Sequence, residues 1–437
     1  MDTHVPPVRP ERVAPPAAGP SQALAPAPSL SPSLSPSRAT AHYIGALFGP
    51  SLLLLPGLAV RDGGPASVLA WGALLVLSAL IAVVFSGLGT RFGSSAGVTG
   101  YAAAGLGRRA GRATGWCFFA GVVAGVPVVC LIGGQYLAAV AGVPRHGTAA
   151  AAGLLVLVLV MRLAGARTGS RLQSMLVALL LVLLAVAVLG TLGSARAAAW
   201  HPFAPNGVHG VFTAAGHLML AFVGWEAAAP LTARLPDARR QLPRVITAAF
   251  LVTAVGYLAL AVTTIAVLGP AAGSTTPLAD LLRVAVGPWG AYLAAATAVL
   301  LTLGVTNAYL QGAAATADHL LRVPGAPARG DRQLPLTVGV AAFGALLLGL
   351  SALSVVDLSA LVALPTALFL LVYLACTVAA TRALRGLPRA AAAVASAVVV
   401  ALLVAAGPVT VVALAVAVAA VACPAPGRRP LADSGRG

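Results

Sequence analysis

Long apolar stretches recur along the whole chain, and the short loops between them carry the charged side chains. Each stretch approaches or exceeds the roughly 20 residues that a helix needs to cross a bilayer. Since backbone groups inside lipid must bond to one another, each stretch is expected to form a helix. The pattern predicts twelve membrane-spanning helices, near residues 42–60, 66–90, 113–141, 149–164, 172–193, 209–232, 245–269, 287–320, 336–355, 358–381, 390–407 and 409–423.

The last predicted span is shorter than the others. Residues 409–423 would form about 22 Å of helix, whereas the hydrocarbon core of a bilayer is roughly 30 Å thick. Arginines lie on both sides of residues 390–423, which favours two full crossings joined at Gly407-Pro408. A hairpin that enters the membrane without crossing it is the alternative.

The arginines alternate along the chain. All 27 basic residues are arginine, and all but Arg61, Arg145, Arg196 and Arg283 lie in the two tails or in every second loop. Because positively charged loops stay in the cytoplasm, both termini are predicted to be cytoplasmic in a multi-pass protein of the cell membrane. The net charge of +17 is then spread over membrane-facing loops, which argues against nucleic-acid binding.

Composition supports the membrane assignment. The chain is 59% hydrophobic and only 8% charged, whereas a typical soluble domain has about 25% charged residues. Small residues at four-residue spacing, such as Gly121 and Gly125, suit close packing between membrane helices. The predicted organisation is a disordered, proline-rich cytoplasmic tail (residues 1–38), a ten-helix core (39–382), two additional helices (383–423) and a short cytoplasmic tail (424–437).

Two of the predicted helices are interrupted. The stretch "GALFGPSLLLLPG" contains Gly49-Pro50, and "FVGWEAAAP" contains Gly224 and Pro230. Proline lacks the N–H that a helix uses, and glycine adds conformational freedom. If spans one to five and six to ten form two halves, the breaks occupy equivalent positions, a pattern that indicates a transporter site. A simple kink is the alternative, since both residues are common in membrane helices.

A few polar side chains interrupt the apolar runs. Glu226 is one of two glutamates in the chain, and an acidic group inside a membrane costs about 2.5–3.5 kcal/mol. We expect it to carry or gate protons near a substrate, and a neutral, hydrogen-bonded packing residue is the alternative. Thr306 and Asn307 are expected to line the same cavity or to bond neighbouring helices. Gln135 and Tyr136 are expected to be anchors at the membrane interface.

Residues suited to enzymatic chemistry or metal binding form no cluster in the sequence. The four cysteines are far apart, the seven histidines are scattered without HExxH spacing, and there is no lysine. The lack of lysine excludes Schiff-base chemistry and a P-loop. We therefore expect neither an enzyme nor a bound cofactor or metal.

Four stretches, in order, resemble the amino acid–polyamine–organocation (APC) permeases. They are "GPSLLLLPGLAVRDGGPASVLAWGALL", "GLGTRFGSSAGVTGYAAAGLGRRAGRATGW", "FVGWEAAAPLTARLPDARRQLPR" and "TNAYLQGAAATADHLL". The third is the most specific, because it matches the sixth helix of the family and the loop after it. The resemblance covers about residues 42–382. The short chain and the stretch "GPSLLLLPG" are most similar to the branch that exports methionine and branched-chain amino acids.

The resemblance implies an all-α, LeuT-type fold, with a five-plus-five inverted repeat and two further helices. It places the substrate between the broken first and sixth helices. Relatives that take arginine carry an aromatic residue where this chain has Leu220, so a cationic substrate is disfavoured. The chain also lacks the arginine that usually follows the small residues of the eighth helix, and the lysine that some relatives carry on the fifth. Carried over by position, the substrate would meet Gly49, Pro50 and Ser51 on one side and Phe222, Gly224, Trp225 and Glu226 on the other.

Taken together, the sequence predicts a secondary transporter of small neutral, hydrophobic amino acids. Asn307 joins the expected substrate-binding residues, and Glu226 is the expected site of proton coupling because no sodium-site signature is clear. The alternatives are an exchanger or exporter without proton coupling, and a non-transporting membrane sensor whose proline-rich tail binds a partner.

Overall fold

The computed structural model describes residues 34–93, 97–165, 170–227, 232, 234–321 and 333–422. Within these ranges the regular elements are helices, with no strand. Seven helical segments there are long and apolar enough to cross a membrane, and four shorter apolar helices accompany them. The chain is therefore an all-helical, multi-pass membrane protein.

Most of the predicted spans correspond to one helix each, and the first and sixth are divided. The helices are Pro36–Leu47 (α1), Ser51–Gly63 (α2), Ser67–Phe92 (α3), Arg108–Val140 (α5), Gly147–Leu163 (α6), Ser170–Gly190 (α7), Gly207–Leu218 (α8), Ala238–Leu268 (α10), Pro288–Leu321 (α12), Gln333–Ala352 (α13), Leu358–Ala383 (α14), Leu387–Ala405 (α15) and Pro408–Ala422 (α16). The predicted tails lie outside the described residues, except for 34–38, where α1 has already begun. The five-plus-five repeat remains a prediction.

Two further helices occupy loops in which no span was predicted. They are α4 (Gly97–Leu106) and α11 (Pro277–Val286). α11 buries Leu281 and Leu282, while Asp280 and Arg283 form an ion pair at 3.2 Å on its other side. Such a two-sided pattern suits a short helix lying across the end of the molecule. With 10 residues, α11 is too short for its apolar face to be recognised as a membrane-spanning run.

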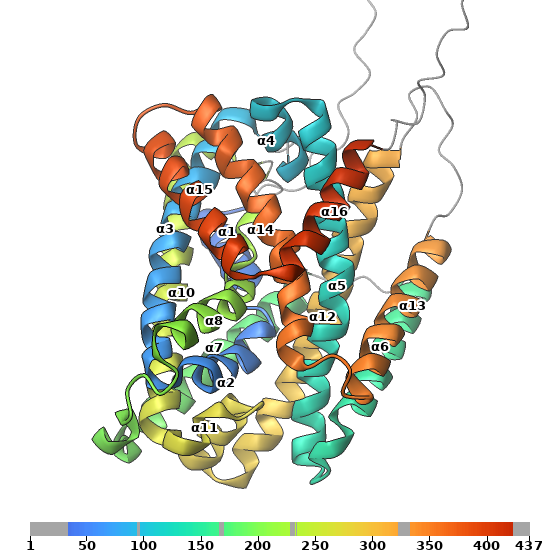
Figure 1. Ribbon diagram of the computed structural model, residues 1–437. Helices are drawn as coiled ribbons and strands as arrows, with labels where there is room; N and C mark the ends of the chain where they lie inside the picture. The colour runs from blue at the N-terminus through green and yellow to red at the C-terminus, as the bar shows by residue number, and fades with distance from the viewer. Residues whose placement is uncertain are drawn as a thin grey trace, which may run out of the picture.

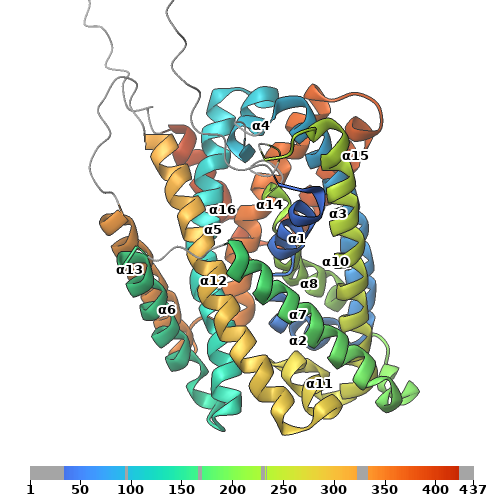
Figure 2. The ribbon, with the colours of Figure 1, turned by 180° about the vertical axis from the view of Figure 1, so that it is seen from behind.

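The long helices stand roughly parallel around a centre that shorter helices cross (Figures 1 and 2). α2 and α8 run across the middle of the molecule in Figure 1, and α1 and α7 cross it in the reverse view. α4 and α11 lie at opposite ends. α6 and α13 stand side by side at one flank. The broken segments are therefore enclosed by long upright helices.

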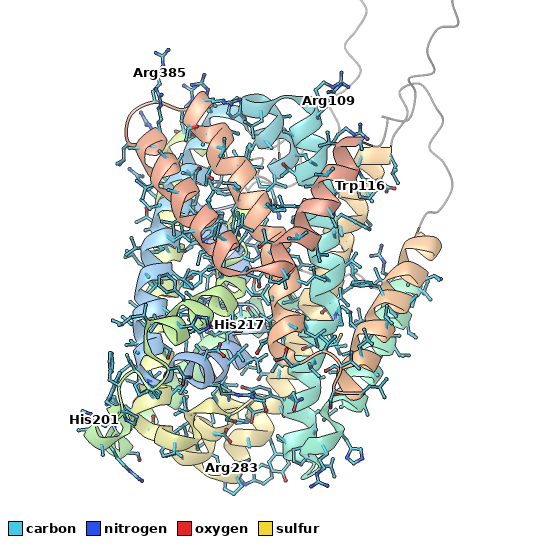
Figure 3. The ribbon with its side chains drawn as sticks, in the orientation of Figure 1. Arg109, Trp116, His201, His217, Arg283 and Arg385 are labelled. Atoms are coloured by element: carbon cyan, nitrogen blue, oxygen red, sulfur yellow. The ribbon has the colours of Figure 1, made fainter. Side chains whose placement is uncertain are left out.

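The charged ends of the molecule follow the alternation of the arginines. Arg109 and Arg385, from loops predicted to share one side, lie at the α4 end, whereas His201 and Arg283 lie at the opposite end (Figure 3). Assignment of the α4 end to the cytoplasm remains a prediction from the arginine count.

Candidate functional site

The first span is interrupted where the sequence has Gly49-Pro50. α1 ends at Leu47 and α2 begins at Ser51. Pro50 has no N–H to donate to the preceding turn, and the Gly49 N–H turns back to the Leu47 carbonyl at 2.9 Å. The N-terminal end of α2, with its partial positive charge, consequently lies at the break.

The sixth span is interrupted next to Glu226. After α8, the chain forms a short 3-10 turn at Met219–Phe222 and a second at Trp225–Ala227. Gly224, between them, has φ 139°, a left-handed conformation that side chains rarely adopt. A Cβ there would come within 2.6 Å of the Ala46 carbonyl oxygen. Gly224 thus allows the sixth-span break to lie directly against the end of α1.

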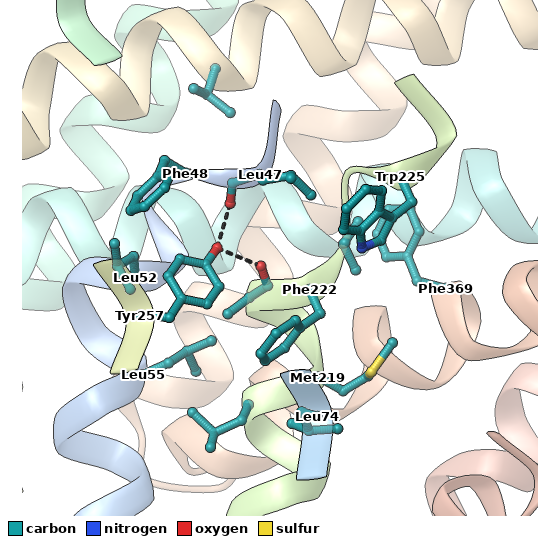
Figure 4. Close-up of a cluster of buried hydrophobic side chains, with 14 of the residues drawn as sticks. Leu47, Phe48, Leu52, Leu55, Leu74, Met219, Phe222, Trp225, Tyr257 and Phe369 are labelled. Carbon is teal, nitrogen blue, oxygen red and sulfur yellow. Dashed lines mark hydrogen bonds between the residues drawn. The ribbon is translucent and has the colours of Figure 1, made fainter. Parts of the chain in front are cut away.

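The hydroxyl of a tyrosine on α10 contacts backbone carbonyls at both breaks. Tyr257 is fully buried, and its hydroxyl lies within hydrogen-bonding distance of the Leu47 carbonyl and of the Ala221 carbonyl, the latter at 2.8 Å (Figure 4). Its ring packs on Phe48 and Phe222 with centroids 5.2 and 5.4 Å apart. Carbonyls freed by the breaks would be costly if left without a donor in an apolar interior. The single hydroxyl hydrogen of Tyr257 is shared between the two carbonyls, and the Leu47 carbonyl also accepts the Gly49 N–H.

Glu226 connects the sixth-span break to α14 through hydrogen bonds. Its Oε2 atom accepts hydrogen bonds from the Gly224 N–H at 3.0 Å and the Tyr373 hydroxyl at 2.9 Å. The Tyr373 oxygen also lies 3.1 Å from the Gly224 nitrogen. The Glu226 Oε1 atom is buried and has no hydrogen-bond partner among the described residues. One carboxyl oxygen therefore holds the break, and the other is available to a proton.

The side chain of Trp225 anchors the same stretch. It is fully buried; its indole N–H donates to Ser78 on α3 at 3.0 Å, and its backbone carbonyl accepts from Tyr43 on α1 at 2.8 Å. Phe222 packs in an aromatic cluster with Trp71, centroids 5.9 Å apart. Both aromatic residues hold the broken helix in place within the packed core.

A cavity of ≈ 80 Å³ opens beside the first break. The predicted residues Gly49, Pro50 and Ser51 line it, together with Ala46, Leu47, Gly121, Val122, Gly125, Val126, Val129, Leu220, Val223, Val305, Thr306, Tyr309 and Phe369. Phe222, Gly224, Trp225, Glu226 and Asn307 are not in contact with it; their chain neighbours Leu220, Val223 and Thr306 are. Among the described lining residues none is charged, so the cavity suits an uncharged, apolar group.

Sequence reasoning missed the contribution of α5 to this cavity. Gly121 and Gly125 were interpreted as packing positions, yet both line the cavity. A Cβ at Gly125 would meet nothing closer than Pro365 Cβ at 3.9 Å, so this glycine leaves open space. The four-residue spacing was a usable signal, but it does not distinguish a helix contact from a cavity wall.

One hydroxyl in the cavity wall has no hydrogen-bond partner. Thr306 is 2% exposed, and its Oγ1 atom is unpaired within the described part of the chain. A buried hydroxyl without a partner is uncommon in folded proteins and calls for a ligand or water. With the hydroxyl of Ser51 and the N-terminal end of α2, it gives an otherwise apolar cavity a polar side.

Tyr136 is not an interfacial anchor, and that prediction was wrong. Its side chain is fully buried, and its hydroxyl donates to the Leu53 carbonyl of α2 at 2.7 Å. The same oxygen accepts the Leu278 N–H of α11 at 3.3 Å. Tyr136 therefore joins α2, α5 and α11. The interface prediction failed because α11, which covers this residue, was not expected.

Known proteins resemble the chain over most of its length. A family profile described as "Amino acid permease" matches residues 34–427. The chain is 26% identical over 369 residues to the uncharacterized amino acid permease YecA of Bacillus subtilis, which covers 82% of this chain and 87% of that protein. It is 27% identical over 376 residues to the L-methionine/branched-chain amino acid exporter YjeH of Escherichia coli, covering 82% and 88%. It is 29% identical over 296 residues to an uncharacterized transporter of Mycobacterium bovis, covering 67% and 64%.

Proposed function

The chain belongs to the amino acid permease family, and from that premise we propose that it is a proton-coupled secondary transporter of neutral, hydrophobic amino acids. Amino acid transport across a membrane, and not catalysis, is the activity that the family and its relatives support. The observation that carries the finer proposal is the uncharged cavity next to the N-terminal end of α2.

The cavity suits an amino acid in one orientation. The carboxylate of the substrate would face the N-terminal end of α2 at Ser51, where the partial positive charge of the helix end favours negative charge. The amino group would face the Thr306 hydroxyl and the carbonyls of the sixth-span break. Ser51 and Tyr309 add the other hydroxyl-bearing side chains to a wall that is otherwise apolar.

The remainder of the wall favours an apolar side chain. Val122, Val126 and Val305 line it with Phe369, and none of these groups could satisfy a charged or amide side chain. An unpaired polar group would lose several kcal/mol there. Leucine and methionine are suitable substrates, and the relative from Escherichia coli is an L-methionine/branched-chain amino acid exporter. By analogy we propose export as the physiological direction.

Glu226 is the proposed proton carrier. As a carboxylate it makes charge-assisted hydrogen bonds with Gly224 and Tyr373, which are about twice as strong as neutral ones. A proton arriving at Oε1 removes that charge and weakens both bonds. The sixth-span break would then be held less firmly against α14.

Alternating access would follow from making and breaking such contacts. Tyr373 links the break to α14, and Tyr136 links α2 to α5 and α11. These links connect the broken helices to the long helices around them. Release of one link while the other holds would open the cavity toward one side of the membrane at a time.

Proteoliposomes provide the test. Uptake of labelled leucine and methionine is measured with and without an outward proton gradient, which drives uptake by an exporter that exchanges its substrate for protons. The proteins compared are the intact protein, Glu226→Gln and, as a control, Glu11→Gln in the N-terminal tail. We expect gradient-driven uptake in the intact protein and the control, and its loss in Glu226→Gln while counterflow exchange persists. Gradient-driven uptake by Glu226→Gln would remove the proton role. Absence of uptake and exchange of both amino acids by the intact protein would remove the substrate class.

A further inference from the structure

A second polar pair lies away from the cavity. His217 Nδ1 is 2.7 Å from Asp62 Oδ2, and the two side chains are 11% and 14% exposed. The residues are 155 positions apart in the chain and meet because α8 packs alongside α2. Figure 3 places His217 in the half of the molecule that ends at His201 and Arg283. The pair is thus in the half of the molecule away from Arg109 and Arg385.

Both residues sit in the last turn of their helices. Asp62 is one residue before the end of α2, and His217 one residue before the end of α8. The C-terminal end of a helix carries partial negative charge, so a carboxylate there is unfavourable unless a cation faces it. The Asp62 main-chain carbonyl is already bonded by Asn206 Nδ2 at 2.7 Å. The Asp62 carboxylate therefore depends on the charge of the His217 ring.

The geometry leaves one ring nitrogen able to take up a proton. A carboxylate only accepts hydrogen bonds, so Nδ1 carries the hydrogen that His217 donates to Asp62. No described residue bonds to Nε2. Histidine is the side chain that ordinarily changes charge between pH 5 and 8. A proton from water can bind Nε2 and leave by the same route, and each step adds or removes the positive charge that faces Asp62.

Other charged groups do not substitute for this pair. Arg61 leans toward the 3-10 turn Gly269–Gly273, where its Cγ would lie 2.7 Å from a Cβ on Gly273. Asp280 and Arg283 on α11 pair with each other. The remaining arginine, aspartate and histidine side chains described on elements packed against α2 and α8 are the exposed His209 on α8, Asp357 at the start of α14, Arg91, Arg382 and Arg389 on α3, α14 and α15, Arg108, Arg109 and Arg112 on α5, and Arg239, Arg240 and Arg244 on α10. The titratable tyrosines and cysteines on these elements are Cys117, Cys130 and Tyr136 on α5, Tyr257 on α10, and Tyr373 and Cys376 on α14.

We propose that Asp62 and His217 form a second proton-binding site of this transporter, on the His201 side of the cavity. The proton on His217 strengthens the contact between α8 and α2, and its loss weakens it. α8 continues directly into Met219–Phe222 and the break at Gly224, so the strength of this contact affects the stretch from which Leu220 and Val223 line the cavity. The proposal rests on the proton-coupled transport proposed above.

The first test measures protonation directly, without any transport. The full-length protein is labelled at histidine Cε1, and its NMR signals are followed from pH 5 to 8.5 in the intact chain, His217→Gln and His209→Gln. We expect one titrating signal to vanish in His217→Gln and to persist in His209→Gln, the matched exposed histidine on the same helix. A His217 signal that stays constant over this range would overturn the proposal.

The second test measures the consequence for transport. Leucine counterflow is measured at equal pH on both sides, from pH 5 to 8.5, so that neither orientation nor driving force matters. We expect at least about a threefold change with pH in the intact protein and in His209→Gln. A smaller change is expected in His217→Gln and Asp62→Asn, in which Glu226 is the remaining proposed proton-binding group. If His217→Gln does not fold, Asp62→Asn provides the comparison by itself. pH profiles of His217→Gln and Asp62→Asn equal to that of the intact protein would overturn the proposal. If the intact protein shows no leucine or methionine counterflow while the NMR signal of His217 still responds to pH, the result counts against the proposed function alone.

Discussion

If the cavity is the substrate site proposed above, Gly125 is predicted to limit how large a substrate side chain it admits. A Cβ at this position would meet only Pro365 Cβ, at 3.9 Å, which is an ordinary contact. Gly125→Ala and Gly125→Val should therefore be accommodated without displacing a neighbour, and the added methyl groups would occupy space in a cavity of ≈ 80 Å³. In an apolar pocket, one methylene of misfit is worth about 1–3 kcal/mol, or about 10–200-fold in rate.

The expected result is a change of selectivity with retained folding. Transport of leucine and methionine should fall by about 10-fold or more in Gly125→Val, with a smaller fall in Gly125→Ala, while transport of alanine or serine is retained. Competition by unlabelled amino acids against labelled substrate in proteoliposomes measures this ratio. The control is Gly153→Val on α6, where a Cβ meets nothing within 4 Å and which does not line the cavity. Equal losses for large and small substrates would refute the assignment of this cavity as the substrate site.

Two further predictions concern the breaks themselves. Tyr257→Phe keeps the ring contacts but removes the hydroxyl that faces the Leu47 and Ala221 carbonyls. The free energy of unfolding should therefore fall by about 1–3 kcal/mol. A melting temperature in detergent equal to that of the intact protein would contradict this prediction. Gly224→Ala should abolish or severely reduce folded protein, because φ is 139° and Ala46 O lies 2.6 Å from the new Cβ. Monodisperse yield measures the effect, with Gly216→Ala on α8, where a Cβ meets nothing within 4 Å, as the control; equal yields would show that the break tolerates a side chain.

The positions of the long helices and of the two breaks follow from local sequence. An apolar run inside lipid has no hydrogen-bonding alternative to a helix, and a Gly-Pro pair weakens a helix at its own position. α1 accordingly ends before Gly49-Pro50, and the sixth span opens at Gly224. The resemblance to APC permeases rests on the same local stretches, and the family match over residues 34–427 confirms it.

The hydrogen-bond partners of buried side chains and the walls of the cavity depend on which helices become neighbours in the fold, and local sequence does not determine this. Tyr257 reaches Leu47 across 210 positions, and Glu226 reaches Tyr373 across 147. In the sequence, the residue type and position of Tyr136 are those of an interface residue, but in the folded protein α11 covers it. From sequence alone Gly125 is equally compatible with a helix contact and a cavity wall; the tertiary structure decides, because a Cβ there would be 3.9 Å from the nearest neighbour, Pro365 Cβ. The backbone of a membrane helix is satisfied within its own segment, whereas a buried side chain is satisfied by whatever the tertiary packing brings beside it.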